Sequence, residues 1–218
     1  MNGSLAGRRV LVSAGPTYED IDPVRFIGNR SSGKMGFALA EQAARLGAQV
    51  TLVAGPVALP TPPGVRRIDV RGAMQMRDAV LASLPGQDVF LSAAAVADFM
   101  PRQAAPDKLK KSAGVPALDL VPTPDILAEV SAHAARPALV VGFAAETADL
   151  EANALDKLQR KNLDLVAANT VGPGLGFESD DNALAVYSGQ GRQDIARQAK
   201  AGVARELLAL VASRLGPP

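Results

Sequence analysis

The segment RVLVSAGPT, residues 9–17, decides the fold class, because an apolar run rich in valine and leucine stops abruptly at Gly-Pro-Thr. Such a run is typical of a strand buried on both faces of a sheet. Residues 32–46 follow with apolar side chains at helical spacing, and Gly47 stands where a glycine commonly ends a helix. A second apolar run at residues 50–54 completes a strand–helix–strand unit, which predicts two parallel strands joined by a helix.

The same alternation continues to the end of the chain. Further strands are predicted at residues 66–70, 88–93, 138–143, 163–168 and 183–187, and helices at 73–84, 124–134, 150–160 and 194–215. This order predicts a single α/β domain over residues 1–218, with a doubly wound, mostly parallel sheet and helices on both faces. Residues of about 99–117, which combine lysines and prolines with few large apolar side chains, predict an inserted flap.

Ligands of doubly wound sheets bind beyond the carboxyl ends of the strands, near the point where the strand order reverses. The segments that the predicted strands place on that rim are 15–17, 93–99, 143–147 and 169–171. We therefore expect the functional site among these four segments.

The composition excludes several kinds of site and partner. The 218 residues include no cysteine and a single histidine, His133, so disulfides, thiolate chemistry and a multi-histidine zinc site are excluded. The net charge of +1 gives no indication of a nucleic-acid or membrane partner. No signal peptide and no apolar run long enough to span a bilayer is apparent, so a cytoplasmic protein is expected.

The segment GNRSSGKMG at residues 28–36 nearly matches a phosphate-binding P-loop. Met35 replaces the hydroxyl residue that a P-loop needs for magnesium, and the segment does not follow its strand directly. Two interpretations stay open. Backbone N–H groups at the start of the helix bind a phosphate, or Ser31 or Ser32 simply caps an ordinary amphipathic helix.

Two further segments allow both a functional and an ordinary interpretation. The small residues of AAAVAD at 93–98 allow a ligand to approach the backbone closely, and Asp98 could accept hydrogen bonds from the hydroxyls of a ribose. The ordinary interpretation is a tight transition from strand to loop, in which Asp98 is solvated. The lysines of DKLKK at 107–111 are suited to a triphosphate, or they form a solvated face. Lys157 and Lys161 share one helix face, where acidic neighbours would make them structural.

Taken together, these segments resemble the phosphopantothenoylcysteine synthetase family. The matching stretches are residues 13–40, which contain GPT, DPVR and NRSSGKMG, residues 50–70, AAAVADF at 93–99, DKLKK at 107–111, PTPDIL at 122–127, VVGFAAET at 140–147, KLQRKNLDLVAANTV at 157–171 and GFESDDNAL at 176–184. They keep the family's order along nearly the whole chain. The resemblance implies a Rossmann-like fold with an extra flap and a homodimer.

The resemblance also implies a reaction: 4′-phosphopantothenate and L-cysteine are joined with CTP and Mg²⁺ through an acyl-cytidylate, with release of CMP and pyrophosphate, in coenzyme A biosynthesis. In many bacteria this unit is the C-terminal half of a bifunctional flavoprotein, with a decarboxylase as the other half. We therefore expect no FMN in this chain and a decarboxylase half as a partner in a full-length protein. Whether the chain is an excised domain or a standalone protein is left open.

Residue roles follow from the resemblance where the motifs match. Asn29 is expected to hold the acyl-cytidylate, and Lys108 to contact the phosphates in the first half-reaction. The residues expected to bind the nucleotide are Ser32, Gly33, Ala94, Ala95, Asp98, Pro122, Thr123, Pro124, Asp125, Phe143, Lys157 and Lys161. Pro122 and Thr123 stand where relatives often carry lysine and asparagine, so only their backbone contacts are carried over. No metal ligand is predicted.

Two alternatives from other classes remain. A nicotinamide-dependent reductase would use the same kind of sheet, but no G-x-G-x-x-G follows the first strand, and neither Tyr18 nor Tyr187 begins a Tyr-x-x-x-Lys pair. A non-catalytic nucleotide-binding module would bind CTP without turning it over, which would leave Asn29 and Lys108 without a chemical role.

Overall fold

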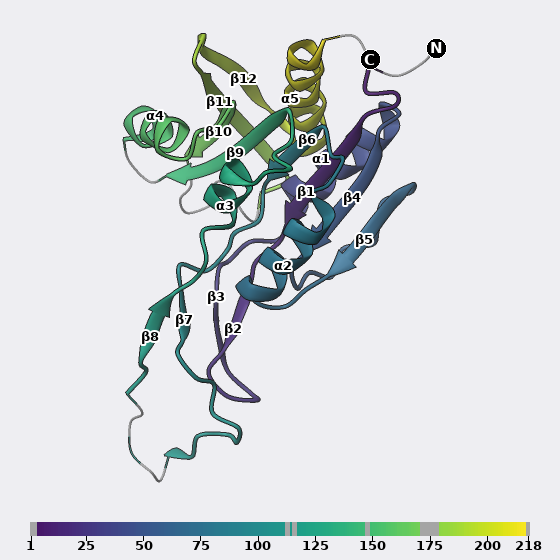
Figure 1. Ribbon diagram of the computed structural model, residues 1–218. Coiled ribbons are helices and arrows are strands. Elements are labelled where there is room, and N and C mark those ends of the chain that lie inside the picture. Colours follow the sequence, from purple (N-terminus) through teal and green to yellow (C-terminus); the bar gives the residue numbers. More distant parts are fainter. Residues whose placement is uncertain (1–3, 112–113, 115–116, 147–148, 171–178, 217–218) are drawn as a thin grey trace.

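The central element is a mostly parallel sheet of eight strands, in the order β12-β11-β10-β9-β6-β1-β4-β5 (Figure 1). This computed structural model describes residues 4–111, 114, 117–146, 149–170 and 179–216. The strands are β1 (Arg9–Ala14), β4 (Gln49–Ala54), β5 (Val65–Asp69), β6 (Val89–Ser92), β9 (Leu139–Glu146), β10 (Leu165–Thr170), β11 (Asp181–Ser188) and β12 (Gly191–Ala199). The six strands from β10 to β5 in this order pair in parallel, and β11 and β12 run antiparallel at one edge. The predicted fold class is confirmed.

Helices cover both faces of the sheet because successive side chains of a strand point to opposite faces. On β1, Val10 and Val12 pack toward α1 (Lys34–Arg45) and α5 (Lys200–Leu215), which share one core cluster. Leu11, between them, belongs to the second cluster. That cluster includes α2 (Ala73–Ser83), α3 (Ile126–Ala132) and α4 (Leu150–Arg160). In the part of the chain that the structure describes, no helix has the length and apolar character needed to cross a membrane.

The prediction of one long helix over residues 194–215 is wrong at its start. Residues 191–199 form β12, which pairs antiparallel with β11, and the helix begins only at Lys200. Alanine, arginine and glutamine favour a helix locally. The ladder with β11 and the burial of Ile195 opposite Leu184 override that preference.

Two small antiparallel pairs, absent from the prediction, project from the sheet (Figure 1). They are β2 (Tyr18–Asp20) with β3 (Phe26–Gly28), and β7 (Phe99–Pro101) with β8 (Leu120–Pro122). We call residues 18–28 and 99–122 together the arm. The predicted flap thus begins where expected, but its returning strand extends to Pro122. Residues 112–113 and 115–116 of the flap lie outside the described residues.

Asp22 joins the two halves of the arm. Its buried carboxylate accepts hydrogen bonds from the backbone N–H groups of Val24 and Arg25, both at 2.8 Å, and from the Arg25 Nε at 3.0 Å. It also accepts the N–H of Leu109 in the flap at 3.1 Å, and Arg25 donates to the Leu109 carbonyl at 2.7 Å. The DPVR motif therefore fixes the flap to the β2–β3 pair.

The pH dependence of this link follows from the Asp22 carboxyl. The hydrogen bond from Arg25, together with three backbone N–H groups, holds the pKa of Asp22 below its ordinary value. A lowered pKa stabilises the folded state above the ordinary aspartate pKa of about 3.9, and that stability is lost as pH falls through the folded-state pKa. We expect the protection factor of the Leu109 amide, which compares its exchange rate with that of an unstructured amide at the same pH, to stay high at pH 5 and to fall only below about pH 4. In Asp22→Asn, protection already lost at pH 7 would support this account, and unchanged protection would contradict it.

Gly55 lets the loop after β4 approach the loop after β1. A Cβ at Gly55 would lie 1.7 Å from the backbone oxygen of Pro16, which has no flexible end to move. We expect Gly55→Ala to lower the free energy of unfolding by about 1–3 kcal/mol or more, the range for overpacked sites. Gly189→Ala is the matched control, because a Cβ at Gly189 would meet no atom within 4 Å and the φ of this residue is not positive. Denaturant unfolding of both variants measures the difference, and equal stabilities would contradict the close approach.

Candidate functional site

A cavity of about 400 Å³ opens at the carboxyl ends of the parallel strands. Its walls come from the end of β6 and the loop after it, from the starts of α1, α3 and α5, and from residues of β9, β10, β11 and the C-terminal half of α4 with its C-cap. The lining residues are Ser31, Ser32, Gly33, Lys34, Met35, Gly36, Ser92, Ala93, Ala94, Ala95, Val96, Ala97, Asp98, Thr123, Pro124, Asp125, Ile126, Leu127, Phe143, Ala145, Lys157, Lys161, Asn169, Asn182 and Lys200. The site thus lies on the rim that the strand pattern predicts.

Most of the residues expected to bind a nucleotide come together in this cavity. Those that line it are Ser32, Gly33, Ala94, Ala95, Asp98, Thr123, Pro124, Asp125, Phe143, Lys157 and Lys161. Three predicted site residues, Asn29, Lys108 and Pro122, are not among its lining residues. Of the predicted rim, Thr147 and Val171 fall outside the described residues. The binding roles themselves stay predictions.

Asn29 is exposed and hydrogen-bonds the backbone of residues that line the cavity. Its Nδ2 donates to the carbonyl oxygens of Ala95 at 3.1 Å and Val96 at 3.0 Å, both of which belong to lining residues. Asn29 therefore holds the loop after β6 in place. Both contacts of the amide nitrogen thus go to backbone oxygens of a segment that lines the cavity.

Thr17 belongs to a segment that the strand pattern places on the rim, but the sequence assigns it no role of its own. The side chain is fully buried, and its Oγ1 accepts the Ala97 N–H at 3.0 Å. The Thr17 N–H donates to Ala95 O at 3.2 Å, and the Ala95 N–H donates to Gly15 O at 2.9 Å. The GPT motif thus ties the loop after β1 to the loop after β6. The sequence signal that could have indicated this role is the threonine that follows Gly-Pro directly after a predicted strand.

The start of α1 differs from the expected cap. Neither Ser31 nor Ser32 caps the helix: Gly33 is the N-cap residue, with φ 75° and no side-chain hydrogen bond to the first turn. Ser31 Oγ instead accepts the Gly33 N–H at 3.3 Å. Glycine tolerates this left-handed conformation, in which a side chain would be strained. The first turn of α1 therefore presents its N–H groups without a side-chain cap, which suits an anion.

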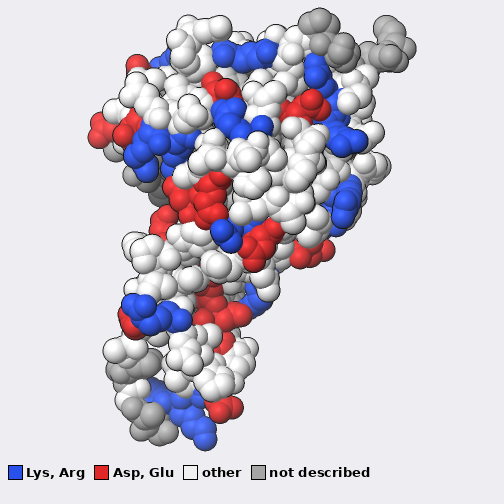
Figure 2. Space-filling model, viewed as in Figure 1, with Lys and Arg blue, Asp and Glu red and all other residues white. Residues whose placement is uncertain are grey.

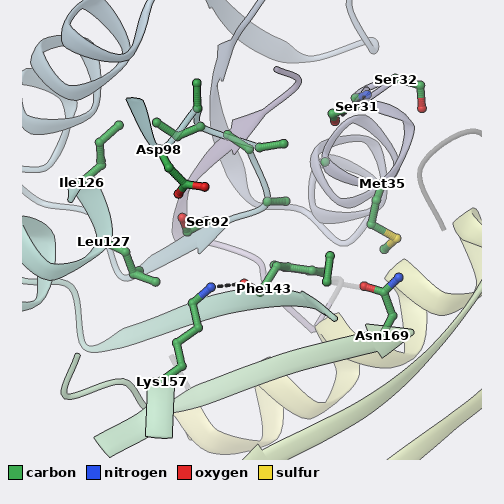
Figure 3. A pocket seen from close by; sticks show the side chains of 18 of the residues that line it. Ser31, Ser32, Met35, Ser92, Asp98, Ile126, Leu127, Phe143, Lys157 and Asn169 are labelled. Atoms are coloured by element: carbon green, nitrogen blue, oxygen red, sulfur yellow. Dashed lines mark hydrogen bonds between the residues drawn. The ribbon is translucent and has the colours of Figure 1, made fainter. Parts of the chain in front are cut away.

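Two lysines at the C-terminal end of α4, Lys157 and the C-cap residue Lys161, line the cavity. Lys157 Nζ donates to the carbonyl of Phe143 at 2.5 Å, and Figure 3 shows this side chain extending from α4 toward β9. Lys161 Nζ lies 2.9 Å from Asp125 Oδ2. Asp125 also caps α3, since its Oδ1 accepts the Ala128 N–H at 3.1 Å. Burial raises the pKa of Asp125, but the bonds from Lys161 and Ala128 outweigh it, so the pKa lies below its ordinary value.

Thr123 links the base of the flap to the loop after β6. Its Oγ1 donates to the Ala97 carbonyl at 2.5 Å and its N–H donates to Asp98 O at 3.0 Å. The threonine therefore closes the base of the flap against the AAAVAD segment. Whether Thr123 also contacts a nucleotide through its backbone stays a prediction.

Comparison with known proteins decides the family. The family model described as "DNA/pantothenate metabolism flavoprotein C-terminal domain" matches residues 5–215. The chain belongs to this flavoprotein C-terminal domain family. A crystal structure of the C-terminal domain of the coenzyme A biosynthesis bifunctional protein CoaBC is similar to it, with 38% identity, a TM-score of 0.84, and coverage of 99% of this chain and 98% of that one.

Curated members of the family are longer than this chain. The CoaBC protein of Vibrio cholerae is 49% identical over 210 residues, which are 95% of this chain and 53% of that protein. The CoaBC protein of Escherichia coli (strain K12) is 52% identical over 182 residues, which are 82% of this chain and 45% of that protein. The chain thus spans about half the length of the curated relatives that it matches.

Proposed function

We propose that this chain is a phosphopantothenate–cysteine ligase, which joins 4′-phosphopantothenate to L-cysteine with CTP in coenzyme A biosynthesis. The observation that carries the proposal is the cavity, which brings an uncapped helix start, the small residues of 93–98 and two lysines of α4 to one place. Membership of the family, whose relatives include coenzyme A biosynthesis proteins, supports it. We treat residues 1–218 as a single catalytic domain and assign FMN chemistry to a separate decarboxylase half.

In the first half-reaction, a carboxylate oxygen of 4′-phosphopantothenate attacks the α-phosphorus of CTP. The bond from the α-phosphorus to the bridging oxygen breaks, and its electron pair leaves with pyrophosphate. The product is a mixed anhydride, the acyl-cytidylate. Because this chemistry needs positioning and charge stabilisation rather than an acid–base residue, the lack of histidine from the cavity is compatible with it.

In the second half-reaction, the amine of cysteine attacks the acyl carbon. The carbon–oxygen bond to the cytidylate breaks, CMP leaves with the electron pair, and the amine loses a proton as the amide forms. Asn29 would act here as a positioning residue, since it orients the Ala95–Val96 backbone that faces the bound intermediate. Loss of Asn29 should then affect the use of the intermediate more than its formation.

Magnesium fits the cavity as a companion of the triphosphate. Mg²⁺ in nucleotide sites is usually held by one or two carboxylates together with phosphate oxygens. Among the described residues, Asp98 and Asp125 are the carboxylates that line this cavity, and Asp125 already pairs with Lys161. Within the described ranges, no group of three or more acidic or histidine side chains forms a protein cage for a metal. When bound, Mg²⁺ would offset the charge of the phosphates.

The arm supports the proposal of a homodimer. Of the seven large hydrophobic side chains found exposed in the described residues, five lie on the arm: Val24, Phe26, Phe99, Leu118 and Leu120. Exposed apolar groups that gather in this way are typical of protein interfaces. Basic and acidic side chains are interspersed over the face seen in Figure 2, and the lower end, where the arm lies, also carries basic groups.

Leu120→Glu is therefore expected to shift the protein from dimer to monomer in sedimentation velocity. The carboxylate would be buried in the apolar interface without a partner, which is costly. Leu155→Glu is the matched control, because Leu155 is also exposed but lies on α4 outside the arm. A dimer that persists in Leu120→Glu, or a monomer in the wild type, would remove the arm from the proposed interface.

The proposed reaction is tested by incubation with 4′-phosphopantothenate, L-cysteine, CTP and Mg²⁺, followed by mass spectrometry. We expect the mass of phosphopantothenoylcysteine together with an equal amount of CMP. A folded protein that forms no amide under these conditions would contradict the proposal.

A further inference from the structure

Two lysines, Lys34 and Lys200, lie near each other at one end of the cavity. No sequence motif relates them. Lys34 is the first residue of α1 and Lys200 the first residue of α5, and both line the cavity. The helices pack side by side on the same face of the sheet. Lys200 is brought there by the β11–β12 hairpin, far from the glycine–serine loop in the sequence.

The surroundings of Lys200 are unfavourable for a positive charge. The side chain is only 6% exposed, and its Nζ donates to the Ser179 carbonyl at 2.5 Å. Burial, followed by the nearby charge of Lys34, lowers the pKa of Lys200, and Asp180 offsets this only in part. Both lysines also stand at the start of a helix, where the helix dipole disfavours cations. Both burial and the neighbouring charge of Lys34 thus oppose the positive charge of Lys200 at this end of the cavity.

Asp180 provides the counter-charge to Lys34 at the rim of the cavity. Its carboxylate lies 2.6 Å from Lys34 Nζ, yet its side chain is 86% exposed, so the pair forms at the rim rather than in the interior. An exposed pair of this kind contributes little to stability. A strongly anionic ligand could displace the carboxylate at small cost and meet both ammonium groups.

The residues predicted to hold the nucleoside lie away from the start of α1. The end of the cavity at the start of α1 is therefore available for the phosphates. Figure 3 shows Ile126, Leu127 and Lys157 along one side and Ser31, Ser32 and Met35 along the other, with Asp98 between them. A nucleoside bound near Asp98 would extend its phosphate chain toward the start of α1. Lys34 adjoins Met35 in the chain there.

Resting on the proposed function, we infer that Lys34 and Lys200 together bind the β- and γ-phosphates of the nucleotide and hold the pyrophosphate that leaves. The two ammonium groups then offset the charge that builds up on the bridging oxygen as its bond to the α-phosphorus breaks. The chemical class of ligand is a polyphosphate, and the nucleoside is held elsewhere.

The test compares affinities by titration calorimetry for inorganic pyrophosphate without added metal, CTP, CMP and 4′-phosphopantothenate. Since a hydrogen bond to a charged group contributes about 1.5–3 kcal/mol, Lys34→Met and Lys200→Met should each weaken pyrophosphate and CTP roughly tenfold to a hundredfold. CMP, which lacks both terminal phosphates, should bind within about twofold of wild type. Asp180→Asn should tighten pyrophosphate binding, because it removes the competing carboxylate.

Two controls separate a binding role from a structural one. Arg205→Met removes one positive charge from an exposed position on the same helix, α5, and should leave all four affinities unchanged. Lys200→Arg keeps the charge and should retain the preference for CTP over CMP. If Lys200→Met does not fold, Lys34→Met carries the test, since its side chain is partly exposed.

The outcomes distinguish this inference from the proposed function. Equal loss of CTP and CMP affinity, or a loss confined to 4′-phosphopantothenate, would overturn the polyphosphate assignment while the ligase reaction stands. If the wild type forms no amide but binds pyrophosphate in a way that both lysine variants weaken, the subsite stands and the ligase proposal fails.

Discussion

Lys108→Gln is expected to abolish formation of the acyl-cytidylate. Glutamine keeps most of the length of the side chain but removes the charge that would stabilise the phosphates in the transition state. Loss of one preorganised electrostatic contact commonly lowers kcat by about 10²–10³, and pyrophosphate release with 4′-phosphopantothenate and CTP measures it. Lys110→Gln is the matched control in the same flap, and we expect nearly normal release. Normal release by Lys108→Gln would remove this residue from the reaction.

The position of Lys108 adds a second expectation. Lys108 is exposed on the arm and is not among the residues that line the cavity of its own chain. If the arm reaches the cavity of a second copy, two inactive variants should complement each other when mixed. Lys108→Gln mixed with a variant inactivated in the cavity would then regain activity, up to about one quarter of the sites after random exchange of subunits. No recovery in confirmed mixed dimers would show that each chain uses its own Lys108.

Asn29→Asp is expected to separate the two half-reactions. An aspartate carboxylate cannot donate to the carbonyl oxygens of Ala95 and Val96, which Asn29 Nδ2 now contacts at 3.1 and 3.0 Å. The negative charge would also repel those oxygens, so the loop that faces the intermediate would move. Misplacement of about 1 Å near a reacting group can cost on the order of 10²-fold in rate.

The measurement for Asn29→Asp is the ratio of pyrophosphate released to amide formed. We expect pyrophosphate release to continue while amide formation falls about a hundredfold, with the acyl-cytidylate escaping into solution. Asn162→Asp is the control, because Asn162 is exposed outside the cavity and its φ of 49° is one that aspartate also adopts. A product yield equal to wild type in Asn29→Asp would exclude Asn29 from the site.

The alternating units of the sheet could be predicted because their signal is local. The apolar run of residues 9–14 and the helical spacing of 32–46 each reflect burial on a defined face, and both elements appear close to their predicted bounds. The rim of the site followed from the same pattern, since the carboxyl ends of parallel strands share one edge. That is why Ala94, Asp98 and Phe143 were found together in the cavity.

The remaining features depend on contacts between distant segments. The strand at residues 191–199 exists because β11 lies beside it, although its composition favours a helix. The two halves of the arm are linked by Asp22, which accepts the N–H of Leu109, 87 residues away. Lys200 reaches the cavity only through the β11–β12 hairpin, so no spacing in the sequence relates it to Lys34. Such pairings have no periodicity that a single sequence could reveal.

The most direct test of the central claim omits cysteine. With 4′-phosphopantothenate, CTP and Mg²⁺ alone, the account predicts a rapid release of pyrophosphate, about one per active site, and a bound species with the mass of the acyl-cytidylate. Addition of cysteine should then release CMP and the amide, and ATP in place of CTP should give a smaller burst. CTP that binds without any pyrophosphate release, before or after cysteine is added, would contradict the account and indicate a nucleotide-binding module.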